Sequence, residues 1–246
     1  MRTLRTKFKK EIIAEFLAPK RKSAKVIIFC DGMPSVPSKK TLLEFFVKKG
    51  YWVFHPRYRG SWESKGQLLQ ISPEQDILDI IDQLSKGFKS IGDNTVYKIN
   101  PRSIYLFTSS FGGPAAILAS RHPLVTKVVA FAPVIDWLVS GKSETIDNLR
   151  EFTKEAFGKG YRFSKKNWDK LKSGKFYNPA THTKEIDGRK IFIIHAKDDE
   201  TVPYQPAVKF AKTTGCKILL LKKGGHLSSS NFGKPGFYKR LKKFLK

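Results

Sequence analysis

Cysteine and methionine are scarce in this chain, since each occurs twice in 246 residues. So few cysteines cannot build a disulfide framework, and a folded chain must be held together by its hydrophobic core. A chain of this length suits one α/β domain, which buries roughly 70 to 75% of the surface that the unfolded chain exposes. Cys30 and Cys216 lie inside apolar runs, where thiols behave as small hydrophobic side chains. We therefore expect reduced thiols and a cytoplasmic location.

Long apolar runs are also missing. No run in the sequence approaches the ~18 to 20 residues that span a bilayer. The basic N-terminus leads into an apolar stretch that Glu11 and Glu15 interrupt, which is unlike a signal peptide. The sequence therefore predicts a soluble protein with no transmembrane segment.

Acidic residues are outnumbered, because 47 Lys and Arg against 21 Asp and Glu give a formal net charge of +26 at pH 7. So positive a chain attracts nucleic acids or anionic membranes at low salt. Lysine far outnumbers arginine, however, whereas specific readers of phosphates and bases rely on arginine. We favour a solvated, lysine-rich surface that binds polyanions only nonspecifically. The alternative is a non-catalytic basic protein that binds nucleic acid or an anionic membrane surface.

Patterns of buried strands and amphipathic helices alternate along the chain, which predicts a mostly parallel central sheet with helices on both faces. Residues 11–17 and 24–30 flank a basic turn and predict a hairpin. The sequence Ser72-Pro73-Glu74-Gln75 predicts a helix that starts with a capping box. Further strand patterns cover residues 51–56, 127–131, 190–196 and 216–221, and helical patterns cover 41–49, 77–84, 204–212 and 237–245.

Residues 136–185 break this alternation. The segment is basic and rich in aromatic residues, and Ile146, Leu149 and Phe152 have helical spacing. Ser164 is placed to cap a second short helix. We interpret the segment as a small helical lid over the strand ends, inserted into a single domain of residues 1–246. Aromatic side chains facing a cleft would favour an apolar acyl or alcohol group.

Residues 108–112, Thr-Ser-Ser-Phe-Gly, join an apolar strand pattern to an apolar helix pattern. This is the context of a nucleophile elbow, in which a strained turn exposes a serine hydroxyl. The residues two before and two after the nucleophile must be small, because the turn presses them together. Ser110 has threonine and glycine there, whereas Ser109 has phenylalanine at both positions. Ser110 is therefore the candidate nucleophile, and an ordinary strand-to-helix turn is the alternative.

Other turns that follow strands also carry polar groups. In open α/β sheets, ligands bind outside the carboxyl ends of the strands, so these turns can converge. Serine catalysis needs a hydroxyl, a base, a carboxylate that orients the base, and amides that face the oxyanion. After Ser110 the chain supplies acidic residues and then His226, and the order serine, acid, histidine is a known triad order.

With these motifs in place, nearly the whole chain resembles the α/β-hydrolase superfamily, and within it the prolyl-oligopeptidase-like and dienelactone-hydrolase-like serine hydrolases. The residues that carry the resemblance are Asp31-Gly32-Met33-Pro34, Arg57-Tyr58-Arg59-Gly60-Ser61, Ser110 with Gly112 and Gly113, the segment from His195 to Pro203, and Gly225-His226.

The resemblance implies a role for each site residue. The segment from His195 is similar to the family pattern His-Gly-x-x-Asp-x-x-Val-Pro, which makes Asp199 the triad acid beside the base His226. Asp198 then faces solvent or braces the loop, and Asp136 is a weaker alternative acid. The backbone amides of Met33 and Phe111 are implied to form the oxyanion hole.

The chain departs from the family pattern at three positions. Thr108 replaces the usual first glycine of the elbow, which predicts strain at the corner. Asp31 replaces the histidine before Gly32, which changes what supports that loop. Ala196 replaces a glycine, which is a mild change.

No cofactor or metal is expected. His182 and Glu185 have no cysteine or second histidine nearby in sequence and fall short of a metal site, and Gly112-Gly113 lacks the rest of a phosphate-binding motif. His55, His122 and His195 are interpreted as packed or solvated. The sequence predicts a hydrolase that cleaves a carboxylic ester, or a short peptide, through an acyl-enzyme on Ser110. The acyl length and the oligomeric state are not predicted.

Overall fold

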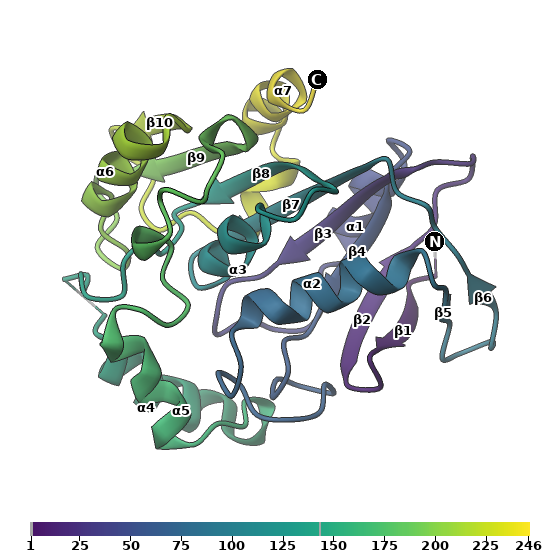
Figure 1. Ribbon diagram of the computed structural model, residues 1–246, viewed down its shortest axis with the longest axis horizontal. Coiled ribbons are helices and arrows are strands. Elements are labelled where there is room, and N and C mark those ends of the chain that lie inside the picture. The colour runs from purple at the N-terminus through teal and green to yellow at the C-terminus, as the bar shows by residue number, and fades with distance from the viewer. Residues whose placement is uncertain (1, 143) are drawn as a thin grey trace.

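The computed structural model describes residues 2–142 and 144–246. Its centre is an eight-stranded sheet in the order β1-β2-β4-β3-β7-β8-β9-β10 (Figure 1). The strands from β4 to β10 in this order are parallel, and β2 runs against both of its neighbours. The predicted parallel sheet is confirmed. The strands are Leu4–Phe8 (β1), Ile12–Leu17 (β2), Lys25–Cys30 (β3), Trp52–Pro56 (β4), Ser103–Ser109 (β7), Val125–Phe131 (β8), Ile191–Ala196 (β9) and Lys217–Leu221 (β10).

The predicted hairpin between residues 11–17 and 24–30 is wrong. Strand β2 pairs with β1 on one side and with β4 on the other, and β3 lies beyond β4. The true hairpin partner escaped the sequence pattern because basic residues alternate with the buried side chains of Thr6 and Phe8. A second small hairpin, of β5 (Phe88–Lys89) and β6 (Val96–Tyr97), was not predicted either.

Helices cover both faces of the sheet, as predicted. Helices α1 (Lys40–Val47) and α7 (Pro235–Phe244) pack on one face, against side chains such as Phe29 and Phe107. Helices α2 (Pro73–Leu84), α3 (Gly112–Ala119) and α6 (Gln205–Thr214) pack on the other face, which Figure 1 shows in front. Alternate residues of β3 enter the two cores, as the period of a strand requires.

The ends of the helices follow the predictions in part. Gly215 ends α6 in the left-handed conformation, with φ of 72°, and the Ser164 hydroxyl accepts a hydrogen bond from the Asn167 amide at the start of α5 (Lys165–Asp169). The capping box at Ser72 is wrong, because the Ser72 side chain makes no cap hydrogen bond. The Gln75 amide bonds to the Ser72 carbonyl instead, at 2.9 Å.

The segment of residues 136–185 packs beside the carboxyl ends of the strands, at the end of the molecule where Figure 1 shows α4 (Ile146–Phe157) and α5. Tyr177 donates a hydrogen bond to the carbonyl of Phe111 at 2.7 Å, and the Trp137 ring nitrogen donates to the Tyr177 carbonyl at the same distance. The segment is therefore tied to the strand-to-helix turn at Ser110. Short 3-10 helices occupy Gly158–Gly160, Lys170–Ser173, Pro179–Thr181, Gly188–Lys190 and, near the C-terminus, Ser229–Gly233.

In the described part of the chain, every helix is too short or too polar to cross a membrane.

Candidate active site

Ser110 occupies the sharp turn between β7 and α3. Its φ of 50° is in the left-handed region, which side chains other than glycine seldom adopt. The surrounding backbone holds it there, because the Ser110 amide donates to the Phe131 carbonyl at 3.1 Å and the Ser110 carbonyl accepts from the amides of Gly113 and Val134. Strain of this kind at a half-buried serine that lines a pocket is typical of a nucleophile elbow. Ser109, the other candidate, is the last residue of β7 and is buried.

Close packing around the turn explains its small residues. A Cβ atom at Gly112 would lie 2.1 Å from the Cys30 carbonyl oxygen, so no larger residue fits there. Thr108 does not distort the corner as predicted: it is a regular, buried residue of β7, and its hydroxyl donates to the Cys30 carbonyl at 2.8 Å. The backbone strain is at Ser110 instead.

The loop after β3 lies against the same turn. A Cβ atom at Gly32 would be 3.2 Å from the Ser110 Cβ, which places this loop beside the serine. In the described chain, neither the Met33 amide nor the Phe111 amide donates a hydrogen bond to another residue. Both amides, predicted for an oxyanion hole, therefore have no acceptor among the described residues.

His226 and Asp199 are joined by a hydrogen bond. The His226 Nδ1 lies 2.8 Å from the Asp199 Oδ2, although the two residues are on different turns. The Asp199 side chain is fully buried, whereas the His226 side chain is 27% exposed. With its Nδ1 proton donated to the carboxylate, the imidazole presents Nε2 as a proton acceptor.

Asp199 is held by several donors besides His226. Its Oδ1 accepts from the amides of Thr201 and Val202, at 3.0 and 2.9 Å. His195 Nε2 lies 3.2 Å from Oδ2 and donates to the Val202 carbonyl at 2.9 Å. Burial alone would raise the pKa of Asp199, but the hydrogen bonds from His195 and His226 outweigh it and hold the pKa well below its usual value.

His195 is thus more than a packed histidine. Sequence reasoning treated it as packed or solvated, and it is completely buried, but its ring also contacts the carboxylate that holds His226. The signal for this contact was the spacing of four residues between His195 and Asp199, across the end of β9.

The other acidic candidates, Asp198 and Asp136, have other hydrogen-bond partners than His226. Asp198 accepts hydrogen bonds from the amides of Gly224 and Gly225, at 3.2 and 2.9 Å, and so braces the loop that leads to His226. Asp136 accepts from the Leu138 amide and from Asn178. The carboxylate that His226 meets belongs to Asp199.

Asp31 is the centre of a buried polar network that sequence reasoning did not find. Its Oδ2 lies 3.1 Å from Lys39 Nζ and 3.3 Å from His55 Nε2, and its Oδ1 accepts from the Ser229 hydroxyl at 2.9 Å. Burial would raise the pKa of Asp31, but His55 and Lys39 lower it well below its usual value. The network ties the loop of Met33 to the segment that follows His226.

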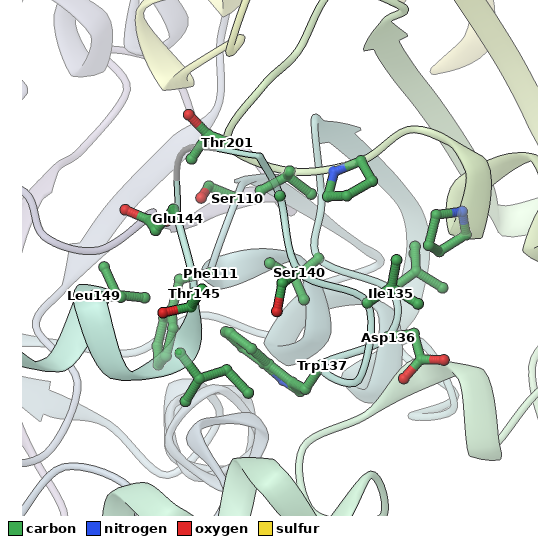
Figure 2. A pocket seen from close by; sticks show the side chains of 17 residues that line it. Ser110, Phe111, Ile135, Asp136, Trp137, Ser140, Glu144, Thr145, Leu149 and Thr201 are labelled. Atoms are coloured by element: carbon green, nitrogen blue, oxygen red, sulfur yellow. The ribbon is translucent and has the colours of Figure 1, made fainter.

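A pocket that opens to solvent lies at this end of the sheet (Figure 2). Ser110 and Phe111 line it together with Thr201 and Val202, whose amides hold Asp199. Much of the remaining wall is apolar and comes from the segment of residues 136–185. Those apolar residues include Trp137, Val139, Ile146 and Leu149, and Ile135 lies just before the segment.

Glu144 also lines this pocket, and sequence reasoning missed it. Burial raises the pKa of Glu144 more than the charge of a protonated His226 lowers it, and the negative charge of Asp199 adds to the rise. The Glu144 carboxyl is therefore close enough to interact electrostatically with both His226 and Asp199. A lone glutamate before a helix has no sequence signature that marks it as part of a site.

His182 and Glu185 form an ordinary hydrogen-bonded pair on the surface. His182 Nδ1 lies 2.9 Å from Glu185 Oε1, and Arg121 contacts the same glutamate. Across residues 2–142 and 144–246, no group of three or more His, Cys, Asp or Glu side chains is arranged to hold a metal ion.

Several solved structures have a fold similar to that of this chain. The chain is similar to the acylaminoacyl peptidase of Pyrococcus horikoshii (23% identity, TM-score 0.65), with 99% of this chain covered but 40% of the peptidase chain. It is also similar to an esterase of Pyrococcus furiosus (15%, 0.67, covering 99% and 89%) and to Est1E of Butyrivibrio proteoclasticus (15%, 0.61, covering 99% of each chain). At these sequence identities the similarity is evidence for the fold alone.

A sequence comparison with curated proteins finds no match. The model of the prolyl oligopeptidase family, by contrast, matches residues 37–246, which include every candidate site residue except the loop of Met33. That match spans well over half of the chain. The chain therefore belongs to the prolyl oligopeptidase family.

Proposed function

We propose that the protein is a cofactor-independent serine hydrolase with Ser110 as nucleophile, His226 as base and Asp199 as the carboxylate that orients the base. The observation that carries the proposal is the 2.8 Å hydrogen bond from His226 to a buried Asp199, whose neighbours Thr201 and Val202 line the same pocket as the strained Ser110. The family match supports it, because the pattern of serine, acid and histidine is the one such enzymes use.

The proposed reaction runs through an acyl-enzyme. His226 Nε2 takes the proton of the Ser110 hydroxyl while Oγ attacks the substrate carbonyl carbon, and the Met33 and Phe111 amides stabilise the oxyanion. The imidazolium then gives its proton to the leaving alcohol or amine as that bond breaks. Water, activated in turn by His226, releases the acid and restores Ser110.

The proposal requires that Ser110 and His226 form a hydrogen bond when substrate binds. In the described chain the two side chains make no hydrogen bond to each other. Such bonds are often long without substrate and tighten when it binds.

The substrate we propose is a carboxylic ester, with a short peptide as the second candidate. The pocket walls favour an apolar group next to the carbonyl, because most of the side chains from residues 135–149 that line it are apolar. The structurally similar proteins include both an esterase and an acylaminoacyl peptidase, so both leaving groups are worth testing.

Hydrolysis of 4-nitrophenyl esters of increasing acyl length, alongside aminoacyl 4-nitroanilides, tests the proposal. We expect measurable ester turnover by the wild type, and a loss of at least about 10³-fold in kcat for Ser110→Ala. Ser109→Ala is the matched control, and we expect it to keep more than half of the wild-type kcat/KM. Equal activity of Ser110→Ala and wild type would exclude Ser110 as the nucleophile.

A further inference from the structure

Glu144 stands out among the acidic residues of this basic protein because no described residue forms a hydrogen bond or an ion pair with it. Most carboxylates in the described chain bond to arginine, lysine, histidine or backbone amides, as Asp31 and Asp199 do. Glu144 makes no hydrogen bond or ion pair within residues 2–142 and 144–246, although it is half-buried. The other described carboxylate without such a partner, Glu155, is exposed on α4, where water solvates it.

The unpaired carboxylate of Glu144 lies in a pocket that is open to a ligand. It lines the same pocket as Ser110, and Figure 2 draws it on the Ser110 side, with Asp136 at the opposite side. Asp136 is already engaged by the Leu138 amide and by Asn178. No lysine or arginine is among the described residues that line the pocket, in a chain with 47 of them.

Apolar walls strengthen the effect of such a charge. A carboxylate in a pocket that is also lined by apolar side chains such as Trp137 and Leu149 acts through a lower effective dielectric than one on the open surface. A cationic group that enters this pocket gains a charge-assisted contact, and a neutral group of the same shape leaves the carboxylate desolvated and unpaired.

We propose that Glu144 is a specificity-determining residue that binds an ammonium or guanidinium group of the substrate beside Ser110. The preferred substrate is then an ester or short peptide that combines an apolar body with a cationic group. The cation is either the side chain of a lysine-like or arginine-like residue or a free α-amino group. This inference rests on the proposed hydrolysis at Ser110.

A purely structural role for Glu144 makes a different prediction. It precedes Thr145, which caps α4, so its charge favours the helix N-terminus. In that role, Glu144→Gln lowers the melting temperature and changes the hydrolysis of cationic and neutral substrates by the same factor. The ratio of the two rates separates the roles.

The experiment compares matched esters by pH-stat titration at pH 7. One arm uses the ethyl esters of Nα-benzyloxycarbonyl-lysine and Nα-benzyloxycarbonyl-norleucine, which differ by a side-chain ammonium. The other uses the ethyl esters of leucine and N-acetylleucine, which differ at the α-amino group. We expect the wild type to prefer the cationic member of at least one pair by about tenfold or more in kcat/KM. The arm that shows the preference identifies the source of the cation.

Glu144→Gln should bring that ratio to within about twofold of one, whereas the matched control Glu155→Gln should keep the wild-type ratio. The absence of a preference in both arms, or a preference that survives in Glu144→Gln, would overturn the inference.

A binding measurement keeps the inference separate from the proposed function. Calorimetric titration with benzamidine and with neutral benzamide needs no turnover. We expect wild type to bind benzamidine at least about tenfold more tightly than benzamide, and Glu144→Gln to lose the difference. Equal affinities would overturn the role of Glu144 even if esters are hydrolysed. Failure of all ester turnover with selective benzamidine binding would overturn the hydrolase and leave the cation site standing.

Discussion

At the scale of single residues, Asp199 holds the candidate base through a crowded set of hydrogen bonds. One oxygen accepts hydrogen bonds from two backbone amides, and the other contacts the imidazoles of His195 and His226. A carboxylate with so many donors has little freedom to rotate. The orientation of His226 is therefore fixed by the turn after β9 rather than by its own loop.

Replacing Asp199 by asparagine should remove most of the activity without unfolding the protein. An amide in place of Oδ2 presents a donor to His226 Nδ1, which favours the wrong tautomer of the imidazole. The expected loss in kcat is about 10⁴-fold, as for other triads that lose the carboxylate. Steady-state ester hydrolysis measures it, with circular dichroism to check the fold.

Asp198→Asn is the matched control for that variant. Asp198 braces Gly224 and Gly225 but does not touch His226, and an asparagine oxygen can keep one of the two bonds. We expect less than about a tenfold loss in kcat. A larger loss in Asp198→Asn than in Asp199→Asn would reassign the acid.

At the scale of elements, the buried Asp31 joins three segments: the loop after β3, strand β4 through His55, and the 3-10 helix after His226 through Ser229. Its folded pKa is depressed, so its contribution to stability is present above the pKa of the unfolded chain, near ~4. That contribution is lost as the pH falls through the lower folded pKa.

Asp31→Asn should therefore destabilise the protein in a pH-dependent way. We expect the free energy of unfolding at pH 7 to fall by about 2 to 3 kcal/mol, because His55 and Lys39 lose their buried partner. Urea unfolding at pH 7 and at about pH 3 measures the difference between variant and wild type, which should shrink at the lower pH. Glu155→Gln, at an exposed position, serves as the control. A difference that grows on acidification would contradict the account.

The elements that the sequence predicted are those with a local signature. Buried parallel strands are continuous apolar runs, so residues 24–30 and 190–196 were identified as strands, and Gly215 marked a helix end. The pairing of strands was not predictable in the same way. The hairpin of β1 and β2 was missed because Leu4–Phe8 is basic on its exposed side, and strand order depends on contacts between distant segments.

The candidate site likewise contains residues that the sequence predicted and residues that it did not. Ser110, Asp199 and His226 sit on turns after strands, so the fold class predicts that they converge, and the pairing of Asp199 with His226 agrees with that. Asp31 and Glu144 were missed because their neighbours come from distant parts of the chain: Ser229 is 198 residues from Asp31. The partners of a carboxylate at such a position can be identified only in the folded structure.

At the scale of the whole molecule, the net charge of +26 is the feature that the proposed hydrolysis does not require. Many carboxylates already pair with arginines, as Glu15, Asp76 and Asp79 do with Arg57 and Arg59. The excess positive charge is therefore on lysines at the surface, where it attracts polyanions without geometric selection.

Binding of fluorescent duplex DNA should accordingly depend steeply on salt. We expect measurable binding at about 50 mM salt and a loss of about 10³-fold or more by 200 mM, with no preference among sequences. Fluorescence anisotropy measures this directly. Tight binding at physiological salt by a protein that turns over no ester would instead support the basic binding protein as the function.

The central claim, that Ser110 is an activated nucleophile, is tested most directly by labelling with a fluorophosphonate probe and locating the adduct by peptide mass spectrometry. The account predicts an adduct on Ser110 in the wild type and in Ser109→Ala, and none in Ser110→Ala. It also predicts that Asp199→Asn is labelled far more slowly than the wild type. Labelling of wild type no faster than of Ser110→Ala, or an adduct on Ser109, would contradict the claim.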